Sequence, residues 1–312
     1  MLDDRPDPGL ATAEAIVQGA LRQARGAPLV TSFFDKATST VTHLVKDPSS
    51  DSCAIIDSVL GFEAASGRTC QRSALALAEV VRQQGLKVEW LLETHVHADH
   101  LSAAPVLQRQ IGGQVAIGAH VSDIRAMLGH LFNDPAARGD DAMGFDHLFQ
   151  DGETFQIGAL QGCALHVPGH TPACMAYVIG DAVFPGDTLF MPDYGTARCD
   201  FPGGDSASLY RSIRRLLSLP QPARVFLCHD YKAPGRDTHA WETTLGAQRA
   251  GNVHVHDGVT EAEFVAWRDA RDATLAMPAL MLPSLQVNLR GGHLPEPESN
   301  GVRYLKIPLN QF

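Results

Sequence analysis

The chain has 312 residues, of which 45% are hydrophobic and 19% are charged, proportions typical of a globular protein with a buried core. Its formal net charge of -10 argues against a nucleic-acid backbone as a partner. No apolar run approaches the roughly 18 residues that a membrane helix needs, so we expect neither nucleic acid nor a membrane as a partner.

Residues 1–28 are predicted to form an N-terminal helical extension, because residues 10–25 are alanine-rich and place apolar side chains such as Ile16 and Val17 at helical spacing. The first residues are acidic and proline-rich, unlike a targeting leader, so we expect a cytoplasmic protein. The six cysteines include no CxxC pair and are expected to be reduced thiols, mostly in the core.

The next part of the chain is predicted to open with a β-meander. Strands are expected at residues 33–36, 40–45, 53–57 and 87–92, with a helix at 71–84 that ends at Gly85. His43 alternates with apolar neighbours and is expected to be an ordinary strand residue rather than a ligand. Asp57 ends its strand facing the same predicted rim as the next loop.

The segment from Thr94 to His100 concentrates more metal-capable side chains than any other seven residues of the chain. It follows an apolar run of strand length, so it is expected on a loop at a strand end. His95, His97, Asp99 and His100 offer imidazole and carboxylate ligands, a mixture that suits a transition metal. A polar loop with satisfied histidines is the plainer alternative, but this density of ligands favours a metal site.

Three later apolar runs each end in a further candidate ligand, namely His170, Asp187 and His229. Loops at strand ends along one rim of a sheet are where a fold gathers distant residues into one site. Between and after them, strands are expected at residues 114–117, 153–157, 162–166, 174–179 and 182–184, and helices at 102–111, 206–219 and 260–275. Ser102 is the predicted N-cap of its helix, and residues 118–150 are expected to be less regular, with a loop at 134–141.

This order of ligands resembles the metallo-β-lactamase superfamily, whose pattern is HxHxDH followed by a lone His, Asp and His. The resemblance implies an α/β fold, the four-layered αβ/βα sandwich of the metallo-β-lactamase type, over residues 29–312. It also implies that Asp57 supports the metal loop through hydrogen bonds. The helix at 260–275 and the tail at 302–309 are expected near the mouth of the substrate site.

A subgroup resemblance follows from segments beyond the metal aspartate. Arg198-Cys199-Asp200-Phe201 resembles the GR-x-DF segment of persulfide dioxygenases, and His229-Asp230-Tyr231 resembles their HDY segment. Arg249 with Asn252 and the segment 288–292 add weaker matches.

The subgroup implies a single Fe²⁺ per chain, held by His95, His170 and Asp187. The remaining metal-capable residues would then lie in a second shell or serve a second metal, and these are His97, Asp99, His100, His229 and Asp57. The reaction implied is oxidation of glutathione persulfide by O2 to sulfite and glutathione.

For the substrate, the resemblance favours Arg198 as the cation beside the reacting group, with Tyr231 and Arg249 as contacts to glutathione. Each has a plainer alternative: Arg198 as an ion pair that staples a loop, Tyr231 as a core ring, and Arg249 as a charge at a helix end. Cys199 is expected to be a buried cysteine rather than a catalytic thiol.

Two alternatives stay open. A hydrolase of the glyoxalase II type would use the same residues to hold two Zn²⁺ per chain and would act on a glutathione thioester. A non-catalytic sensor is the second alternative, although a binding module has no need of open coordination positions. The apolar segment 276–283 fits either a homodimer interface or a loop that closes over the chain's own core.

Overall fold

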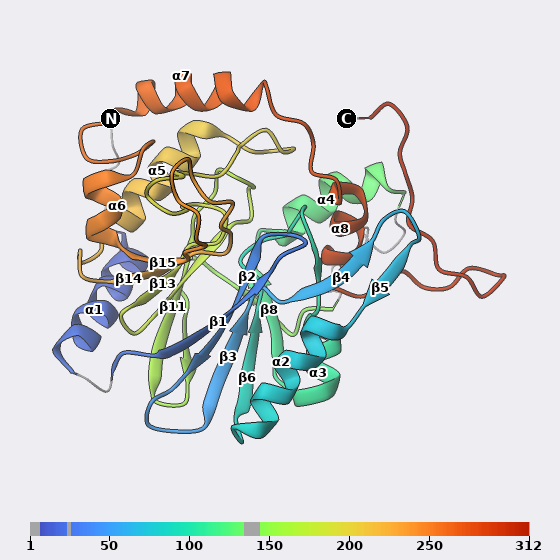
Figure 1. The fold of residues 1–312 in the computed structure, drawn as a ribbon, viewed down its shortest axis with the longest axis horizontal. Coiled ribbons are helices and arrows are strands. Elements are labelled where there is room, and N and C mark those ends of the chain that lie inside the picture. Colours follow the sequence, from blue (N-terminus) through green and yellow to red (C-terminus); the bar gives the residue numbers. More distant parts are fainter. Residues whose placement is uncertain (1–6, 24–25, 134–143, 312) are drawn as a thin grey trace.

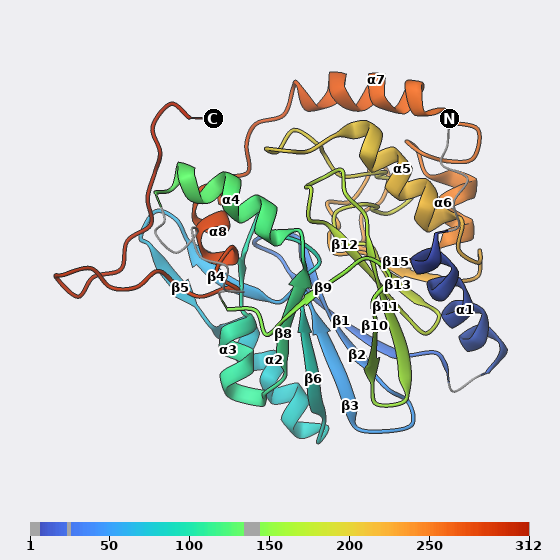
Figure 2. The same cartoon turned by 180° about the vertical axis from the view of Figure 1, so that it is seen from behind.

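The computed structural model describes residues 7–23, 26–133 and 144–311, and its centre is a pair of facing β-sheets (Figures 1 and 2). The strands of the first sheet lie in the order β1 (Leu29–Asp35), β2 (Thr40–Lys46), β3 (Ser52–Ile56), β6 (Lys87–Leu92), β8 (Gln114–Gly118) and β9 (His147–Phe149). The first three strands pair antiparallel, and β3, β6, β8 and β9 pair parallel.

The second sheet is built from the later part of the chain. Its strands are β10 (Thr154–Ile157), β11 (Leu160–His166), β12 (Met175–Ile179), β13 (Ala182–Phe184), β14 (Arg224–Phe226) and β15 (Glu242–Thr244), in that order. All pairs are antiparallel except β13 with β14, which is parallel. The crossover between those two strands contains a helix, as a parallel connection requires.

Both faces of the central strands are buried, which explains their continuous apolar runs. In β3, Ala54 and Ile56 point into the core between the sheets, while Cys53 and Ile55 point to the opposite side. In β12, Tyr177 faces the core between the sheets and Val178 faces outward. This period of two places one hydrophobic core between the sheets and one on the outer side of each.

Helices cover the outer faces and complete four layers, which confirms the predicted fold class (Figures 1 and 2). The core outside the first sheet contains side chains from α2 (Arg72–Gln83), α3 (Ala104–Ile111), α4 (Val121–Leu131) and α8 (Met281–Asn288). The core outside the second sheet contains side chains from α1 (Pro8–Arg22), α5 (Ser206–Leu217), α6 (Leu245–Gly251) and α7 (Glu261–Asp272). None of the described helices is long and apolar enough to cross a membrane.

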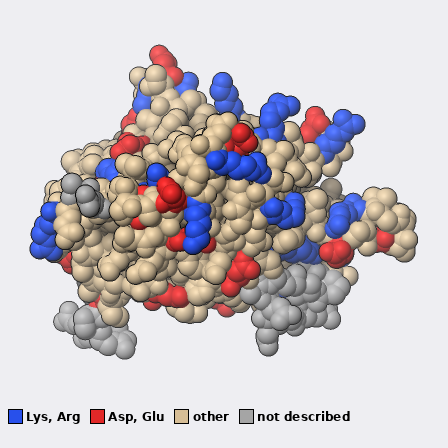
Figure 3. Space-filling model, turned by 90° about the horizontal axis from the view of Figure 1, so that it is seen from below, with Lys and Arg blue, Asp and Glu red and all other residues tan. Residues whose placement is uncertain are grey.

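The N-terminal helix α1 packs on the body of the domain, against β11 and β12. Asp7 caps it by accepting a hydrogen bond from the backbone N–H of Leu10 at 2.9 Å. Arg215 of α5 binds the Asp7 carboxylate through two nitrogens at 2.7 and 2.9 Å and also binds Asp151. On the face in Figure 3, basic and acidic side chains are interspersed rather than gathered into one basic patch.

Several local expectations were wrong. Residues expected to be irregular form α4. Of the two alternatives left open for 276–283, packing on the chain's own core agrees with the structure, since Met281 lies in that core, although residues 281–283 begin α8 rather than continue a loop. Ser102 is not the N-cap of α3, which is Ala103; it lies in β7 (Leu101–Ser102), which joins β4 (Val59–Glu63) and β5 (Arg68–Cys70) in a small third sheet. Its hydroxyl accepts the backbone N–H of Ala104, the first residue of α3, at 3.1 Å and donates to Glu93 at 2.5 Å.

Two further expectations concern the segment 134–141 and the C-terminal tail. The loop predicted at 134–141 falls outside the described residues. The tail at 302–309 forms no helix or strand and leaves Ile307 and Leu309 exposed at 70% and 76%. It contacts α8 where the backbone N–H of Lys306 donates to Gln286 at 2.7 Å.

Candidate metal centre

The candidate ligands meet at one rim of the sandwich because each follows a strand that ends there. The loop of residues 94–100 follows β6, and His170, Asp187 and His229 follow β11, β13 and β14 respectively. The sequence-predicted ligands are thus brought together from four separate loops, and all five candidate histidines are buried.

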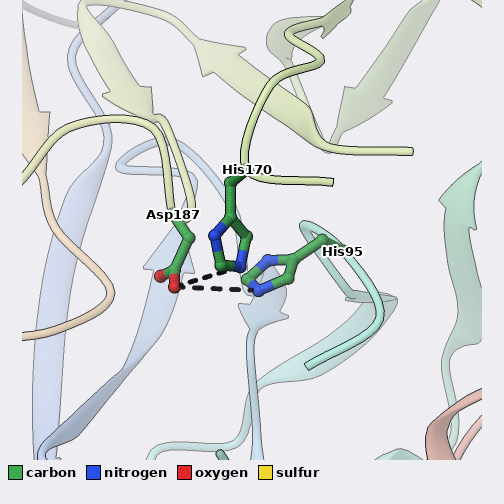
Figure 4. Close-up of side chains that lie close together, drawn as sticks. All are labelled: His95, His170 and Asp187. Atoms are coloured by element: carbon green, nitrogen blue, oxygen red, sulfur yellow. Dashed lines mark ion pairs between the residues drawn. The ribbon is translucent and has the colours of Figure 1, made fainter. Parts of the chain in front are cut away.

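Three of them form a compact group, shown in Figure 4. Oδ2 of Asp187 lies 3.5 Å from Nε2 of His170 and 4.0 Å from Nε2 of His95. One ligand atom from each residue lies within 4.8 Å of the others. Two imidazoles and one carboxylate therefore face a common point.

Hydrogen bonds at the other ring nitrogens fix which nitrogen is free. Nδ1 of His170 lies 2.8 Å from the carbonyl of Arg198 and must donate to it, which leaves Nε2 with a lone pair. Nδ1 of His95 lies 2.9 Å from the hydroxyl of Thr94, which itself donates to Asp57 at 2.8 Å. His95 therefore also presents a bare Nε2, a buried atom with no hydrogen-bond partner in the described structure.

These orphaned nitrogens are what a bound cation would satisfy. Burial, together with the neighbouring His97 and His170, lowers the pKa of His95 well below its usual range, so the ring is neutral and able to bind a metal. The residues present thus fit a transition-metal ion.

Asp57 anchors the loop that carries His95. It ends its strand in a left-handed conformation, with φ of 54°, and accepts the backbone N–H of Thr94 at 2.8 Å. It also accepts Nε2–H of His97 at 3.0 Å, and Glu93 lies 3.2 Å from the same nitrogen. Burial lowers the pKa of His97, but these two carboxylates outweigh it and hold that pKa well above its usual range.

A second set of ligands lies beside the first. Nε2 of His229 is 3.4 Å from Oδ2 of Asp99 and 3.5 Å from Oδ1 of Asp187. Nδ1 of His100 lies 3.0 Å from Asp99 and donates to it, so the atom left for a metal is Nε2, which is buried without a partner among the described residues. Cys228 adds a thiol whose Sγ donates to Oδ1 of Asp187 at 2.9 Å.

A glycine permits the two metal-bearing loops to approach each other. Gly186 precedes Asp187 and has φ of 52°, a conformation that favours glycine. A Cβ at this position would lie 2.6 Å from Oγ1 of Thr94, the hydroxyl that links Asp57 to His95. The close approach therefore helps to set the position of Asp187 relative to His95.

The model of the metallo-beta-lactamase superfamily matches residues 36–229. The chain belongs to this superfamily.

Among relatives in the superfamily, a probable metallo-hydrolase of Burkholderia pseudomallei is 56% identical over 90% of this chain and 99% of its own length. Glyoxylase B2 of Dictyostelium discoideum is 44% identical over 89% of this chain and 96% of its own. The human mitochondrial persulfide dioxygenase ETHE1 is 28% identical over 75% of this chain and 83% of its own. The crystal structure of ETHE1 from Myxococcus xanthus matches with a TM-score of 0.68 and 27% identity, over 85% of this chain and 100% of that one.

A cleft of about 460 Å³ opens onto the metal centre of this superfamily member, and its wall includes His170 and Asp187. Two of the three expected substrate contacts, Arg198 and Tyr231, line it as well. The Tyr231 ring stacks on His229 with their centroids 5.5 Å apart. The cleft is large enough for a ligand of peptide size.

The remaining expectations fare differently. Arg198 donates to both oxygens of Asp200 at 2.5 Å and to the carbonyl of Ala276 at 2.7 Å. Its guanidinium is therefore held by contacts within the protein. Arg249 does not line the cleft; its Nε donates to Asp257 at 2.9 Å. Cys199 is buried, and burial raises the pKa of its thiol, which disfavours the reactive thiolate.

Sequence reasoning gave no role to three residues that shape the centre. Glu93 lies against His97, and Cys228 donates to Asp187. Asn288 of α8 donates to the carbonyls of His97 and His100, both at 2.8 Å, and so ties the C-terminal part of the chain to the metal loop. The available signals were the position of Cys228 next to His229 and the match of segment 288–292, which contains Asn288.

Proposed function

We propose that this chain is a mononuclear non-haem iron dioxygenase that oxidises glutathione persulfide with O2 to sulfite and glutathione. The proposal rests on the surroundings of the Asp187 carboxylate. Its Oδ2 faces the bare Nε2 atoms of His95 and His170, while its Oδ1 accepts a hydrogen bond from the thiol of Cys228.

Among the candidate ligands, His95, His170 and Asp187 form one compact group, with one ligand atom from each within 4.8 Å of the others. Nε2 of His100 and Nε2 of His229 are also buried without a partner in the described structure, so these are the atoms that a second metal would use. The proposed iron site is the compact group, because two histidines and one carboxylate are the ligand set of non-haem Fe²⁺ oxygenases and leave positions open. One Fe²⁺ per chain would supply the site where persulfide and O2 react together.

The protein's own residues would position the reactants. Thr94 and Asp57 fix the ring of His95, and the carbonyl of Arg198 fixes the ring of His170. The cleft bordered by Tyr231 accommodates a peptide-sized carrier. The similarity to persulfide dioxygenases and the free state of all six cysteines support this reaction in a reducing cytoplasmic setting.

A second function has an observation in its favour. Nε2 of His229 lies within 3.5 Å of both Asp99 and Asp187, so a second cation has candidate ligands beside the first. With two Zn²⁺ per chain, the same cleft would suit hydrolysis of a glutathione thioester. The similarity to the Burkholderia metallo-hydrolase and to glyoxylase B2 supports this alternative.

Oxygen uptake separates the two functions. Iron-loaded protein is supplied with glutathione persulfide in an oxygen electrode, and sulfite is measured in the same sample. The dioxygenase consumes O2 and forms sulfite, and His170→Ala abolishes both. Hydrolysis of S-lactoylglutathione without any persulfide-dependent uptake would reject the proposal in favour of the hydrolase.

A further inference from the structure

We propose that Arg271, supported by Arg268 and His254, forms an anion subsite in the cleft that binds the glycine carboxylate of the glutathione carrier. The inference rests on the proposed function for the identity of the carrier. The three residues line the same cleft as the metal ligands. Arg271 stands in the last turn of α7, which forms one wall of the cleft.

Arg271 is the cation of this wall without an acidic partner. Arg198 forms an ion pair with Asp200, and Arg268 forms one with Asp272, which lies one turn further along α7. Within the part of the chain that the structure describes, Arg271 forms no ion pair and donates to the hydroxyl of Thr274 at 3.2 Å. Most of its guanidinium donors are therefore free for an incoming carboxylate.

Arg268 adds a second donor that lacks an acceptor. The residue is 3% exposed, and its Nε is a buried atom without a hydrogen-bond partner in the described structure. Its guanidinium also lies 4.7 Å from the ring centroid of Trp267, which holds it in place. A buried donor left unpaired in a cleft wall points to an acceptor that arrives with the ligand.

His254 presents a further N–H group. Its Nδ1 accepts the backbone N–H of Thr196 at 3.1 Å, so the neutral ring carries its proton on Nε2. Burial and the nearby charges of Arg268 and Arg271 lower its pKa to about 4, so the ring is neutral at physiological pH. Its ring centroid lies 3.6 Å from that of Trp267 on α7.

The charges along the cleft wall are separated in a way that suits one orientation of the carrier. The acidic lining residues Asp99 and Asp187 belong to the metal centre, and Asp193 is neutralised by Arg236 at 2.7 Å. The α7 side contributes arginines. Glutathione has one carboxylate beside an ammonium group and one at its glycine end, and two arginines favour the carboxylate that carries no neighbouring cation.

The helix that carries Arg271 is anchored, so the subsite is formed before the ligand binds. A capping box between Thr260 and Glu263 starts α7. Phe264 is 1% exposed and lies 5.7 Å from the ring of Tyr210 on α5. The hydroxyl of Tyr210 donates to the carbonyl of Val259 at 2.7 Å, just before the helix.

Calorimetric binding tests the subsite without relying on turnover. S-methylglutathione and its glycine ethyl ester are titrated into the full chain, as wild type and as Arg271→Gln. The wild type should bind the free acid about tenfold more tightly than the ester, the size expected for a charge-assisted hydrogen bond. Arg271→Gln should bind the free acid about tenfold more weakly than the wild type does, and it should bind the acid and the ester equally.

Arg22→Gln is the matched control, because Arg22 is also exposed in the last turn of a helix and lies outside the cleft lining. It should behave as the wild type. Equal binding of acid and ester by the wild type, or unchanged discrimination in Arg271→Gln, would overturn the subsite, as would a failure of the wild type to bind either compound. Discrimination by Arg271 without persulfide-dependent O2 uptake would uphold the subsite and reject the dioxygenase.

Discussion

The thiol of Cys228 lies 2.9 Å from Oδ1 of Asp187 and donates a hydrogen bond to it. The opposite oxygen, Oδ2, faces His95 and His170. The two oxygens of one carboxylate therefore have different surroundings, and only one is free of a protein donor. This asymmetry disfavours a carboxylate that bridges two cations.

Removing the thiol should make a second metal easier to bind. We expect Cys228→Ala, exposed to excess zinc and then desalted, to retain more than one metal per chain, whereas the wild type retains about one. Cys228→Ser keeps a donor and should resemble the wild type. Elemental analysis checks this, and equal metal content in all three proteins would contradict the role given to Cys228.

Asp57 should control metal affinity through the loop that it anchors. Asp57→Asn loses a carboxylate that accepts from Thr94 and His97, so we expect metal affinity to fall by about 10- to 100-fold. A competition titration with a chelating dye measures this. Asp181→Asn removes a carboxylate that pairs with Arg224 away from the centre, and its metal affinity should not change.

The glycine between the two metal loops gives a third prediction. Gly186→Ala combines a positive φ with a Cβ only 2.6 Å from Thr94, so the loops must separate and metal affinity should fall. Gly235 also has a positive φ, but nothing lies within 4 Å of its Cβ position. Gly235→Ala should cost about 1 kcal/mol of stability with normal metal affinity, and similar metal loss in both variants would contradict this account.

The turn before β3 gives a prediction about pH. Burial raises the pKa of Asp47, but hydrogen bonds from Ala159, Ser49 and Ser50 outweigh it and lower that pKa from 3.8 to about 2. A lowered pKa stabilises the folded state above the unfolded value, and this contribution is lost as pH falls from about 4 to about 2.

Asp47→Asn should therefore reduce the free energy of unfolding by on the order of 2 kcal/mol at pH 7. The difference from the wild type should shrink below pH 4 and nearly vanish near pH 2. Urea unfolding across this pH range measures it. A difference that stays constant with pH would show that the Asp47 charge does not contribute.

The sequence predicted the layered fold and the candidate ligands because both leave local signals. Apolar runs of strand length locate most strands, and the His95 to His100 cluster is conspicuous in any reading. α4 was not predicted because no side chain caps its N-terminus, so the sequence carries no start signal there. Ser102 was taken as an N-cap because serine is common at that position, but the N-cap is Ala103. The pairing of Ser102 with Val59 of β4 is a tertiary contact that no local pattern shows.

Contacts between distant segments could not be predicted. Asn288 reaches His97 across a sequence separation of 191 residues, and α7 brings Arg271 to the cleft from far along the chain. For the arginines, the sequence left two roles open: Arg198 pairs with Asp200 two residues away, and Arg249 pairs with Asp257, so an ion pair is formed in both cases. Which arginine is free is a property of the folded chain.

We propose that a single iron is held by His95, His170 and Asp187. The most direct test is elemental analysis of anaerobically purified protein, followed by oxygen consumption when glutathione persulfide is added to the same sample. We predict about one iron per chain and O2 uptake in the wild type, with both lost in His95→Ala. Two zinc ions per chain with no persulfide-dependent uptake would contradict the claim.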